Sequence, residues 1–149
     1  MLKDKTAIIT GSNRGIGFAI LKKMSEMNQD TLATSIGLEL TDFGDNYICG
    51  KIPVDKRTIQ PFGLLHGGAS VALAETLGSL AGNMLINSSV EMVVGISINA
   101  NHLISVKNGW VYGKALPLKI GNKIQVWEIK IRDKYDNLVC ISRLTLAVV

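Results

Sequence analysis

The chain has 149 residues, of which 47% are hydrophobic and 5% aromatic, and its formal net charge is +4. This length predicts one domain, and the hydrophobic content excludes a disordered polar chain. Nucleic-acid binding is disfavoured because it calls for a dense basic stripe with aromatic side chains, and the positive charges here are spread out. No apolar run reaches the length of a membrane span, and Cys49 and Cys140 lack metal-ligand spacing. We therefore expect a cytoplasmic protein with free thiols.

Residues 3–20 resemble the opening of a short-chain dehydrogenase. Thr10, Gly11, Gly15 and Gly17 match the T-G-x-x-x-G-x-G loop that holds a dinucleotide pyrophosphate in that family. A dinucleotide fold needs several βαβ units, however, and the remaining sequence predicts another fold. Tyr47 and Lys51 repeat the Y-x-x-x-K pattern of the same enzymes, but in a strand-like run where the two lie ~13 Å apart. We interpret residues 1–16 as a leader and residues 17–149 as the domain, with an NAD(P)-binding dehydrogenase fragment as an alternative.

The elements that follow predict an α+β fold. A helix is expected over 17–27, then strands over 36–43 and 47–54, joined by the turn Gly44-Asp45-Asn46. Residues 55–65 predict a loop, because Pro61 lacks an N–H and biases Gln60 away from helix. A long helix begins around His66-Gly67-Gly68 and is expected to end near residues 87–89. Four more strands are expected over 92–103, 109–118, 123–132 and 138–148, which gives an antiparallel sheet wrapped around the long helix.

The long helix has two contrasting faces. Apolar residues recur with helical spacing on one of them: Leu73, Leu77, Leu80 and Met84. Glu75 falls on the opposite face with Val71, Gly78, Ser79 and Gly82. Because that face carries no Lys, Arg or Asp, we favour a carboxylate in a partly dry cleft over a solvated surface. Such a carboxylate can act as a general base or a nucleophile. The small residues predict that another chain or a ligand approaches the helix closely here.

The start of the same helix offers backbone donors. The Gly67 and Gly68 amides lie where helical N–H groups are unpaired and the helix dipole is positive, so they can stabilise a developing oxyanion. Gln60 and His66 add polar groups just upstream. Together with a carboxylate, these groups suit acyl transfer to water.

The segment Q-P-F-G-L-L-H-G-G-A-S-x-x-L-A-E-x-x-G-S, which begins at Gln60, resembles the hotdog-fold acyl-CoA thioesterases with a catalytic Glu on the central helix. The similarity continues in I-N-A-N-H-L (98–103), P-L-x-x-G (117–121), Q-V-W-E-I (125–129) and S-R-L-T (142–145), and it extends from about Leu21 to the C-terminus. Within the family, the chain is most similar to members that act on aryl thioesters. Their substrates are 1,4-dihydroxy-2-naphthoyl-CoA of menaquinone biosynthesis or a misacylated aryl carrier protein.

The resemblance implies a role for each site residue. Glu75 is the nucleophile or general base, and the Gly67 amide belongs to the oxyanion hole. Gln60 and Ser79 position the water or the acyl intermediate, and His66 orients the thioester. The implied substrate-binding residues are Gly95, His102, Leu103, Ser105, Lys119, Gly121, Asn122 and Lys123. Ile104 stands where the family often has Arg, which moves part of the phosphate contact to Lys107 or Lys119.

The resemblance also implies a site formed between subunits of a homodimer or of a dimer of dimers. It requires no metal or redox cofactor, and CoA enters only as part of the substrate. A histidine metal site is disfavoured because neither His66 nor His102 has a carboxylate at ligand spacing. A serine triad is disfavoured because Ser70 has no evident His–Asp partnership. We therefore expect an aromatic acyl-CoA thioesterase. The alternatives are a carrier-protein thioesterase, the dehydrogenase fragment, and a hotdog ligand carrier without catalytic activity.

Overall fold

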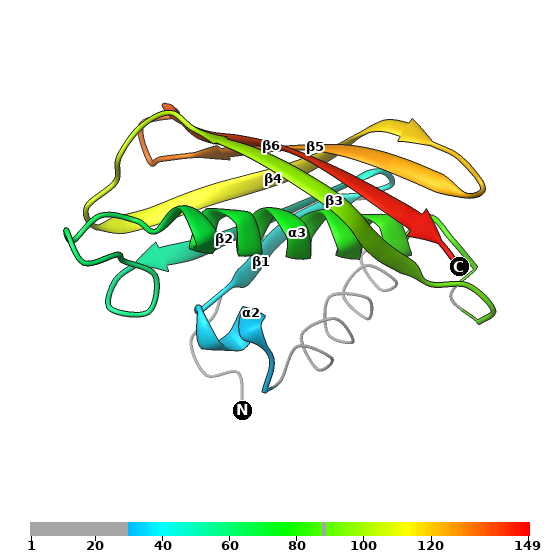
Figure 1. Cartoon of the computed structure of the whole chain (residues 1–149), viewed down its shortest axis with the longest axis horizontal. Coiled ribbons are helices and arrows are strands. Elements are labelled where there is room, and N and C mark those ends of the chain that lie inside the picture. The colour runs from blue at the N-terminus through cyan, green and yellow to red at the C-terminus, as the bar shows by residue number, and fades with distance from the viewer. Residues whose placement is uncertain (1–29, 88) are drawn as a thin grey trace.

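The computed structural model describes residues 30–87 and 89–149, which form one antiparallel sheet curved around a long helix (Figure 1). The elements in chain order are α2 (Leu32–Ser35), β1 (Glu39–Gly44), β2 (Tyr47–Val54), α3 (Gly67–Asn83), β3 (Val93–His102), β4 (Gly109–Ile120), β5 (Ile124–Arg132) and β6 (Leu138–Val148). The strand order is β1-β2-β4-β5-β6-β3, so β3 is an edge strand beside the last strand of the chain. This arrangement confirms the predicted α+β fold.

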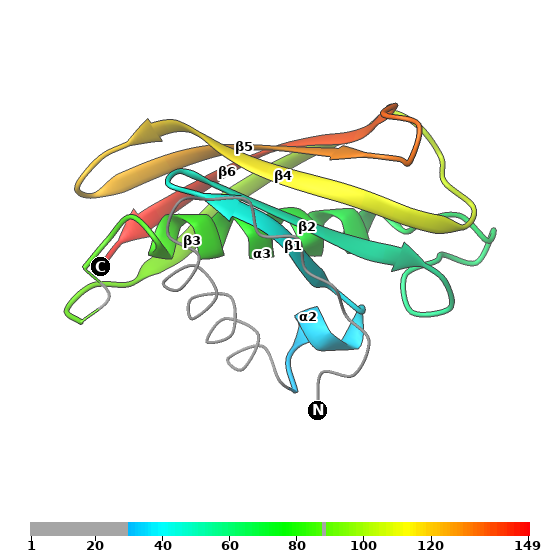
Figure 2. The same cartoon turned by 180° about the vertical axis from the view of Figure 1, so that it is seen from behind.

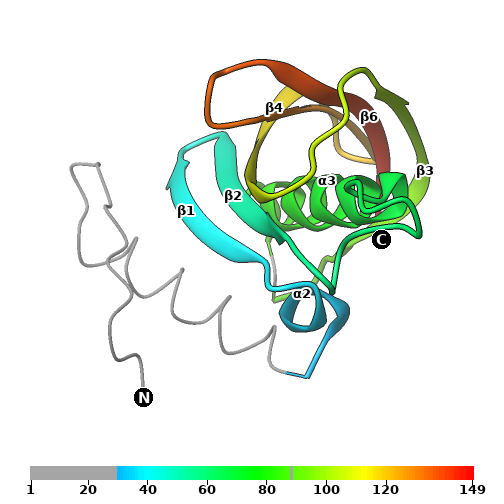
Figure 3. The same cartoon turned by 90° about the vertical axis from the view of Figure 1, so that its left-hand side faces the viewer.

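The helix α3 fills the hollow of the sheet, as the end-on view shows (Figure 3). From behind, β1 and β2 cover the side of α3 that lies away from β3 (Figure 2). Alternation along the strands turns one set of side chains inward, and in β5 this set includes Trp127, Ile129 and Ile131, all fully buried. Leu73 and Leu77 of α3 are also fully buried, and the other two residues of the predicted apolar face, Leu80 and Met84, are partly buried and pack against the same core.

The core also holds polar groups that are paired. The Trp127 indole N–H donates to the Gln125 side-chain oxygen at 3.0 Å, and the Gln125 amide donates to the Gly82 carbonyl at 3.4 Å. A buried side-chain polar group without a partner costs ~1–3 kcal/mol, so this chain of hydrogen bonds permits Gln125 to lie inside the sheet. These two hydrogen bonds also hold the last turn of α3 against β5.

Two element boundaries differ from the sequence expectation by three residues or more. The helix α3 ends at Asn83 and not near residues 87–89, because the Asn83 side chain bonds two backbone groups and turns the chain toward β3. Its Nδ2 donates to the Ser79 carbonyl at 3.0 Å, and its Oδ1 accepts from the Val93 amide at 3.3 Å. The strand β1 begins at Glu39 and not at Ile36, because residues 32–35 are helical and Ile36 caps them. The helix expected over 17–27 and the boundary at residue 17 lie outside the described residues.

The small-residue face of α3 also packs differently from the sequence expectation. Gly78 and Gly82 are buried and lie against Leu144 and Leu146 of β6 in the same chain. A Cβ placed on Gly82 would be 2.6 Å from Leu146 Cδ1, closer than real Cβ contacts. These glycines therefore let the helix approach its own sheet, and they form no open slot for a ligand or another chain.

Tyr47 and Lys51 both lie in β2, as the sequence predicted. The Tyr47 hydroxyl donates to Asp42 Oδ2 at 3.0 Å, while Lys51 Nζ pairs with Glu39 Oε2 at 3.2 Å. Each side chain has its own carboxylate partner, so the pair does not form a dehydrogenase dyad.

Replacing Gly78 by Ala tests the contact between α3 and β6. Overpacking typically costs ~1–3 kcal/mol, and the better helix propensity of Ala returns ~1 kcal/mol. We expect the free energy of unfolding, measured with denaturant, to fall by up to ~2 kcal/mol. Ser79→Ala, at the neighbouring partly exposed position, should be close to neutral. A Gly78→Ala variant at least as stable as the parent would contradict this packing.

Candidate active site

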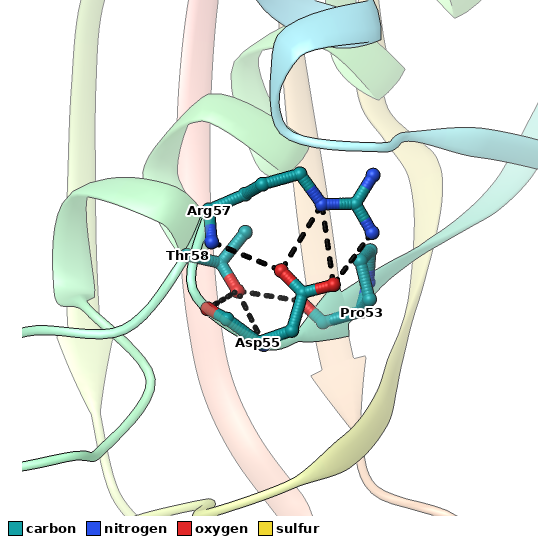
Figure 4. A network of polar contacts seen from close by, with 4 residues as sticks. All are labelled: Pro53, Asp55, Arg57 and Thr58. Atoms are coloured by element: carbon teal, nitrogen blue, oxygen red, sulfur yellow. Dashed lines mark hydrogen bonds and ion pairs between the residues drawn. The ribbon is translucent and has the colours of Figure 1, made fainter.

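The loop before α3 is anchored at its base by side chains (Figure 4). Arg57 Nη2 and Asp55 Oδ2 form an ion pair at 2.6 Å, and the Thr58 hydroxyl donates to the Pro53 carbonyl at 2.6 Å. The hydrogen bonds from Arg57 lower the pKa of the Asp55 carboxyl to about 2. The His66 amide donates to the Thr58 carbonyl at 2.8 Å. This hydrogen bond fixes the position at which α3 begins.

Gln60 lies within this loop, and its side-chain oxygen stabilises the turn that follows. The Gln60 amide donates to the Leu64 carbonyl at 2.8 Å, and Gln60 Oε1 accepts from the Phe62 amide at 2.6 Å. Gly63 follows at φ +75°, a conformation that glycine adopts without strain. Because the side-chain oxygen is used in the turn, the Gln60 amino group is the part available to a ligand.

His66 caps the helix and leaves the next amide open. Its Nδ1 accepts from the Gly68 amide at 2.7 Å, so a neutral His66 ring carries its proton on Nε2. The Gly67 amide, in the first helical position, donates to none of the described residues. It therefore remains an unpaired donor at the positive end of α3.

This amide faces a cavity of about 290 Å³ at the start of the helix. The cavity contains five of the predicted site residues, namely Gln60, Gly67, His102, Leu103 and Ser105; Leu64, Leu65, Ser70, Ile104 and Val139 complete its wall. The His102 ring lies directly against Gly67, since a Cβ there would be 2.8 Å from His102 Nε2. The absence of a side chain at Gly67 therefore lets the His102 ring lie this close to the helix terminus.

Ser70 is a cavity residue that the sequence reading missed. The sequence offers it only as a nucleophile without a His–Asp pair. Residues three apart lie on nearly the same side of a helix, so the spacing from Gly67 to Ser70 was the signal that could have identified it.

Glu75 occupies a second position, farther along α3. It lies eight residues after Gly67, ~12 Å along the helix axis, and does not line the cavity of its own chain. The side chain is partly buried and its carboxylate lies against Gly95 of the edge strand β3. Burial raises the pKa of the Glu75 carboxyl above its ordinary value, as the sequence analysis anticipated. Ser79, one turn further along, is also partly exposed.

The remaining predicted residues, Lys119, Gly121, Asn122 and Lys123, form a third group around the turn between β4 and β5. Strand register places this turn at one end of the sheet, where Ile124 pairs with Ala147 and Val93 pairs with Val148. His102 pairs with Cys140 at the opposite end. One chain alone therefore keeps these four residues and the Gly67 cavity at opposite ends of α3.

A larger cavity of about 630 Å³ lies on the outer face of the sheet and contains none of the predicted site residues. Its wall includes Asp42, Cys49 and Lys114, together with residues of the turn between β5 and β6. We assign the chemistry to the smaller cavity, because it combines a free helix-terminal amide with converging polar side chains.

Antiparallel strands wrapped around one helix, whose first amide opens into a cavity, define a hotdog-type acyl-transfer enzyme. Residues 62–140 match the family model described as the thioesterase superfamily. A solved thioesterase structure from Haemophilus influenzae is 47% identical, covers 87% of this chain and 90% of its own, and superposes with a TM-score of 0.83. The chain belongs to the thioesterase superfamily and is a thioester hydrolase with the hotdog fold.

Two curated relatives are similar over nearly the same region. The 1,4-dihydroxy-2-naphthoyl-CoA hydrolase of Escherichia coli is 44% identical over 128 residues, which are 86% of this chain and 93% of that protein. The proofreading thioesterase EntH of Cronobacter turicensis is 46% identical over 128 residues, with the same two coverages. Among the described residues, no helix is long and apolar enough to cross a membrane.

The raised pKa of Glu75 predicts how stability depends on pH. A carboxyl with a raised folded pKa favours folding while protonated, and that contribution is lost as the pH rises through the folded pKa. Glu75→Gln should therefore be more stable than the parent at neutral pH, and the gain should vanish below the ordinary value of 4.5. Denaturant titrations from pH 4 to 8 measure this. The exposed control Asp45→Asn should show no such gain, and a Glu75→Gln gain that is largest in acid would contradict the assignment.

Proposed function

We propose that this thioesterase hydrolyses an aromatic acyl-CoA similar to 1,4-dihydroxy-2-naphthoyl-CoA, giving the free acid and CoA. The observation that carries the catalytic part is the unpaired Gly67 amide at the start of α3, in a cavity shared with Gln60 and His102. The aromatic acyl group is supported by the name of the Escherichia coli relative, which is 44% identical. Such an activity would belong to menaquinone biosynthesis in the cytoplasm.

In the proposed reaction, the thioester carbonyl oxygen accepts a hydrogen bond from the Gly67 amide. Glu75 acts on the carbonyl carbon, either by removing a proton from the attacking water or by direct attack, followed by hydrolysis of the acyl intermediate. A C–O bond forms, the C–S bond breaks, and the departing CoA thiolate takes up a proton. Gln60, His66 and Ser79 hold the water and the thioester in place. No metal or redox cofactor enters this scheme.

The scheme requires a second copy of the chain. Glu75 lies ~12 Å along the helix from the Gly67 amide, too far to act on a carbonyl bound there. The strand β3, which passes over Glu75, is an edge strand with exposed apolar side chains at Val94 (42%) and Ile96 (57%). Met92, the residue just before β3, is also exposed (59%). We propose that two copies associate at this edge as a homodimer, which can pair further into a dimer of dimers. Each copy then presents Glu75 to the Gln60–Gly67 segment of its partner.

The same association accounts for the third group of predicted residues. In one chain, Lys119 and Lys123 are remote from the Gly67 cavity, but a second copy can supply its own turn to the same substrate. We propose that Lys119, Gly121, Asn122 and Lys123 contact the CoA phosphates, together with Lys107. His102, Leu103 and Ser105 then line the path of the pantetheine, and Gly95 borders Glu75.

Replacing Glu75 tests the catalytic assignment. Glu75→Ala and Glu75→Gln should each lower kcat by at least ~10², because a positioned base or nucleophile is lost. The rate of thiol release over a panel of acyl-CoAs measures this, with circular dichroism to show that the fold is retained. Glu91→Gln, which removes an exposed carboxylate, should keep the parent rate. A Glu75→Ala variant with the kcat of the parent would contradict the proposed mechanism.

Mixing two inactive variants tests the site between subunits. Glu75→Ala and Gln60→Ala each damage a different half of the proposed shared site. After subunit exchange, a mixed dimer holds one intact site and one doubly damaged site, so activity should recover toward half of the parent value in mixed dimers. Each variant treated alone provides the control. No recovery, when exchange is shown by differently tagged subunits, would mean that each chain carries a complete site.

A substrate panel tests the acyl group. The kcat/KM values for 1-hydroxy-2-naphthoyl-CoA, 4-hydroxybenzoyl-CoA and phenylacetyl-CoA should exceed that for palmitoyl-CoA, because selectivity depends on contacts kept in the transition state. An aryl-loaded carrier protein belongs in the same panel, because the 46% identity to a proofreading thioesterase supports it as the second candidate substrate. Equal or faster hydrolysis of palmitoyl-CoA would overturn the aromatic assignment and leave the thioesterase activity in place.

A further inference from the structure

Ser70 is the most buried polar side chain in the wall of the Gly67 cavity. It is 1% exposed, and its hydroxyl has no hydrogen-bond partner among the described residues. Serine within a helix commonly bonds the carbonyl four residues back, which here belongs to His66. That bond is absent, and the His66 carbonyl accepts instead from the Ala69 and Ser70 amides.

The Ser70 hydroxyl opens to the cavity. In the described part of the chain, Asp42 Oδ1 is the one wholly inaccessible side-chain oxygen or nitrogen without a partner. The unpartnered Ser70 oxygen therefore retains contact with the cavity space that it lines. A hydroxyl in this setting costs free energy unless a ligand or water bonds to it.

The helix geometry directs this hydroxyl toward the Gly67 amide. Three residues of α-helix rotate by about 300°, so Gly67 and Ser70 lie about 60° apart around the axis. The Cα–Cβ bonds of a helix also tilt toward its N-terminus, which brings the Ser70 side chain back toward the first turn. Both donors thus converge on the same end of one cavity.

We infer that the Ser70 hydroxyl is a second oxyanion donor, which bonds the same thioester carbonyl oxygen as the Gly67 amide. This inference rests on the proposed function. The hydroxyl keeps its proton throughout, while negative charge grows on the oxygen as the new C–O bond forms and declines as the C–S bond breaks. Because the hydrogen bond strengthens only as that charge develops, Ser70 lowers the barrier more than it improves substrate binding.

The variant Ser70→Ala removes the donor without adding volume. We expect kcat to fall by about 10²-fold with KM nearly unchanged, as for other oxyanion donors. The loss should be the same for every acyl group that the parent enzyme hydrolyses, because the carbonyl is common to all of them. Binding of an unreactive thioether analogue of the substrate, measured by calorimetry, should equal that of the parent. Ser70→Cys, which restores a weak donor, should be intermediate.

Ser142→Ala is the matched control. Ser142 is 2% exposed, lies in β6 and contacts Cys140 Sγ at 3.7 Å outside the cavity. It should keep the parent kcat and report any general effect of removing a buried hydroxyl. A kcat for Ser70→Ala within about threefold of the parent, or a loss that varies with the acyl group, would overturn the inference. The proposed aromatic specificity is judged separately, from the rates of the parent enzyme across the acyl panel.

Discussion

The structure depends on the burial of one helix inside its own sheet. Because α3 lies in the hollow of the sheet, its first turn opens into a half-open cavity and not onto a flat surface. A helix-terminal amide exposed to bulk water already donates a hydrogen bond to water, so a ligand gains little free energy by replacing that water. The same amide in a cavity that is partly shielded from water interacts more strongly with a developing negative charge. The burial of the helix thus places an ordinary helix terminus where the proposed reaction can use it.

Glycine is needed where the helix is closest to its neighbours, and it has a different purpose at each end. At Gly78 and Gly82, the missing side chains allow the backbone of α3 to reach β6. At Gly67, the missing side chain leaves room for the His102 ring beside the free amide. Gly78 and Gly82 thus determine how closely the helix packs against the sheet. The contact between Gly67 and His102 shapes the cavity at the start of the helix.

Glu75 lies at a position where burial works against the stability of an ionised side chain. Its carboxylate is partly removed from water beside the edge strand, where no described cation pairs with it, so burial raises its pKa. An ionised carboxylate in such a place is less stable than in water, and it is correspondingly a better base. The cost is tolerable because the side chain remains partly exposed at the edge of the sheet, where the proposed second copy would bind.

The sequence by itself determined the fold class and the polar groups at the start of the helix. Strand alternation, turn residues and the spacing of Leu73 and Leu77 are local patterns, so they are readable without coordinates. The tertiary structure decided which groups share a space. It packed Gly78 and Gly82 against the chain's own sheet, joined His102 and Ser70 to Gly67, and kept Glu75 and Lys119 away from that cavity. Helical spacing shows which residues share a face, but not what that face meets, because the facing strand β6 begins at residue 138, 55 residues after α3 ends at residue 83.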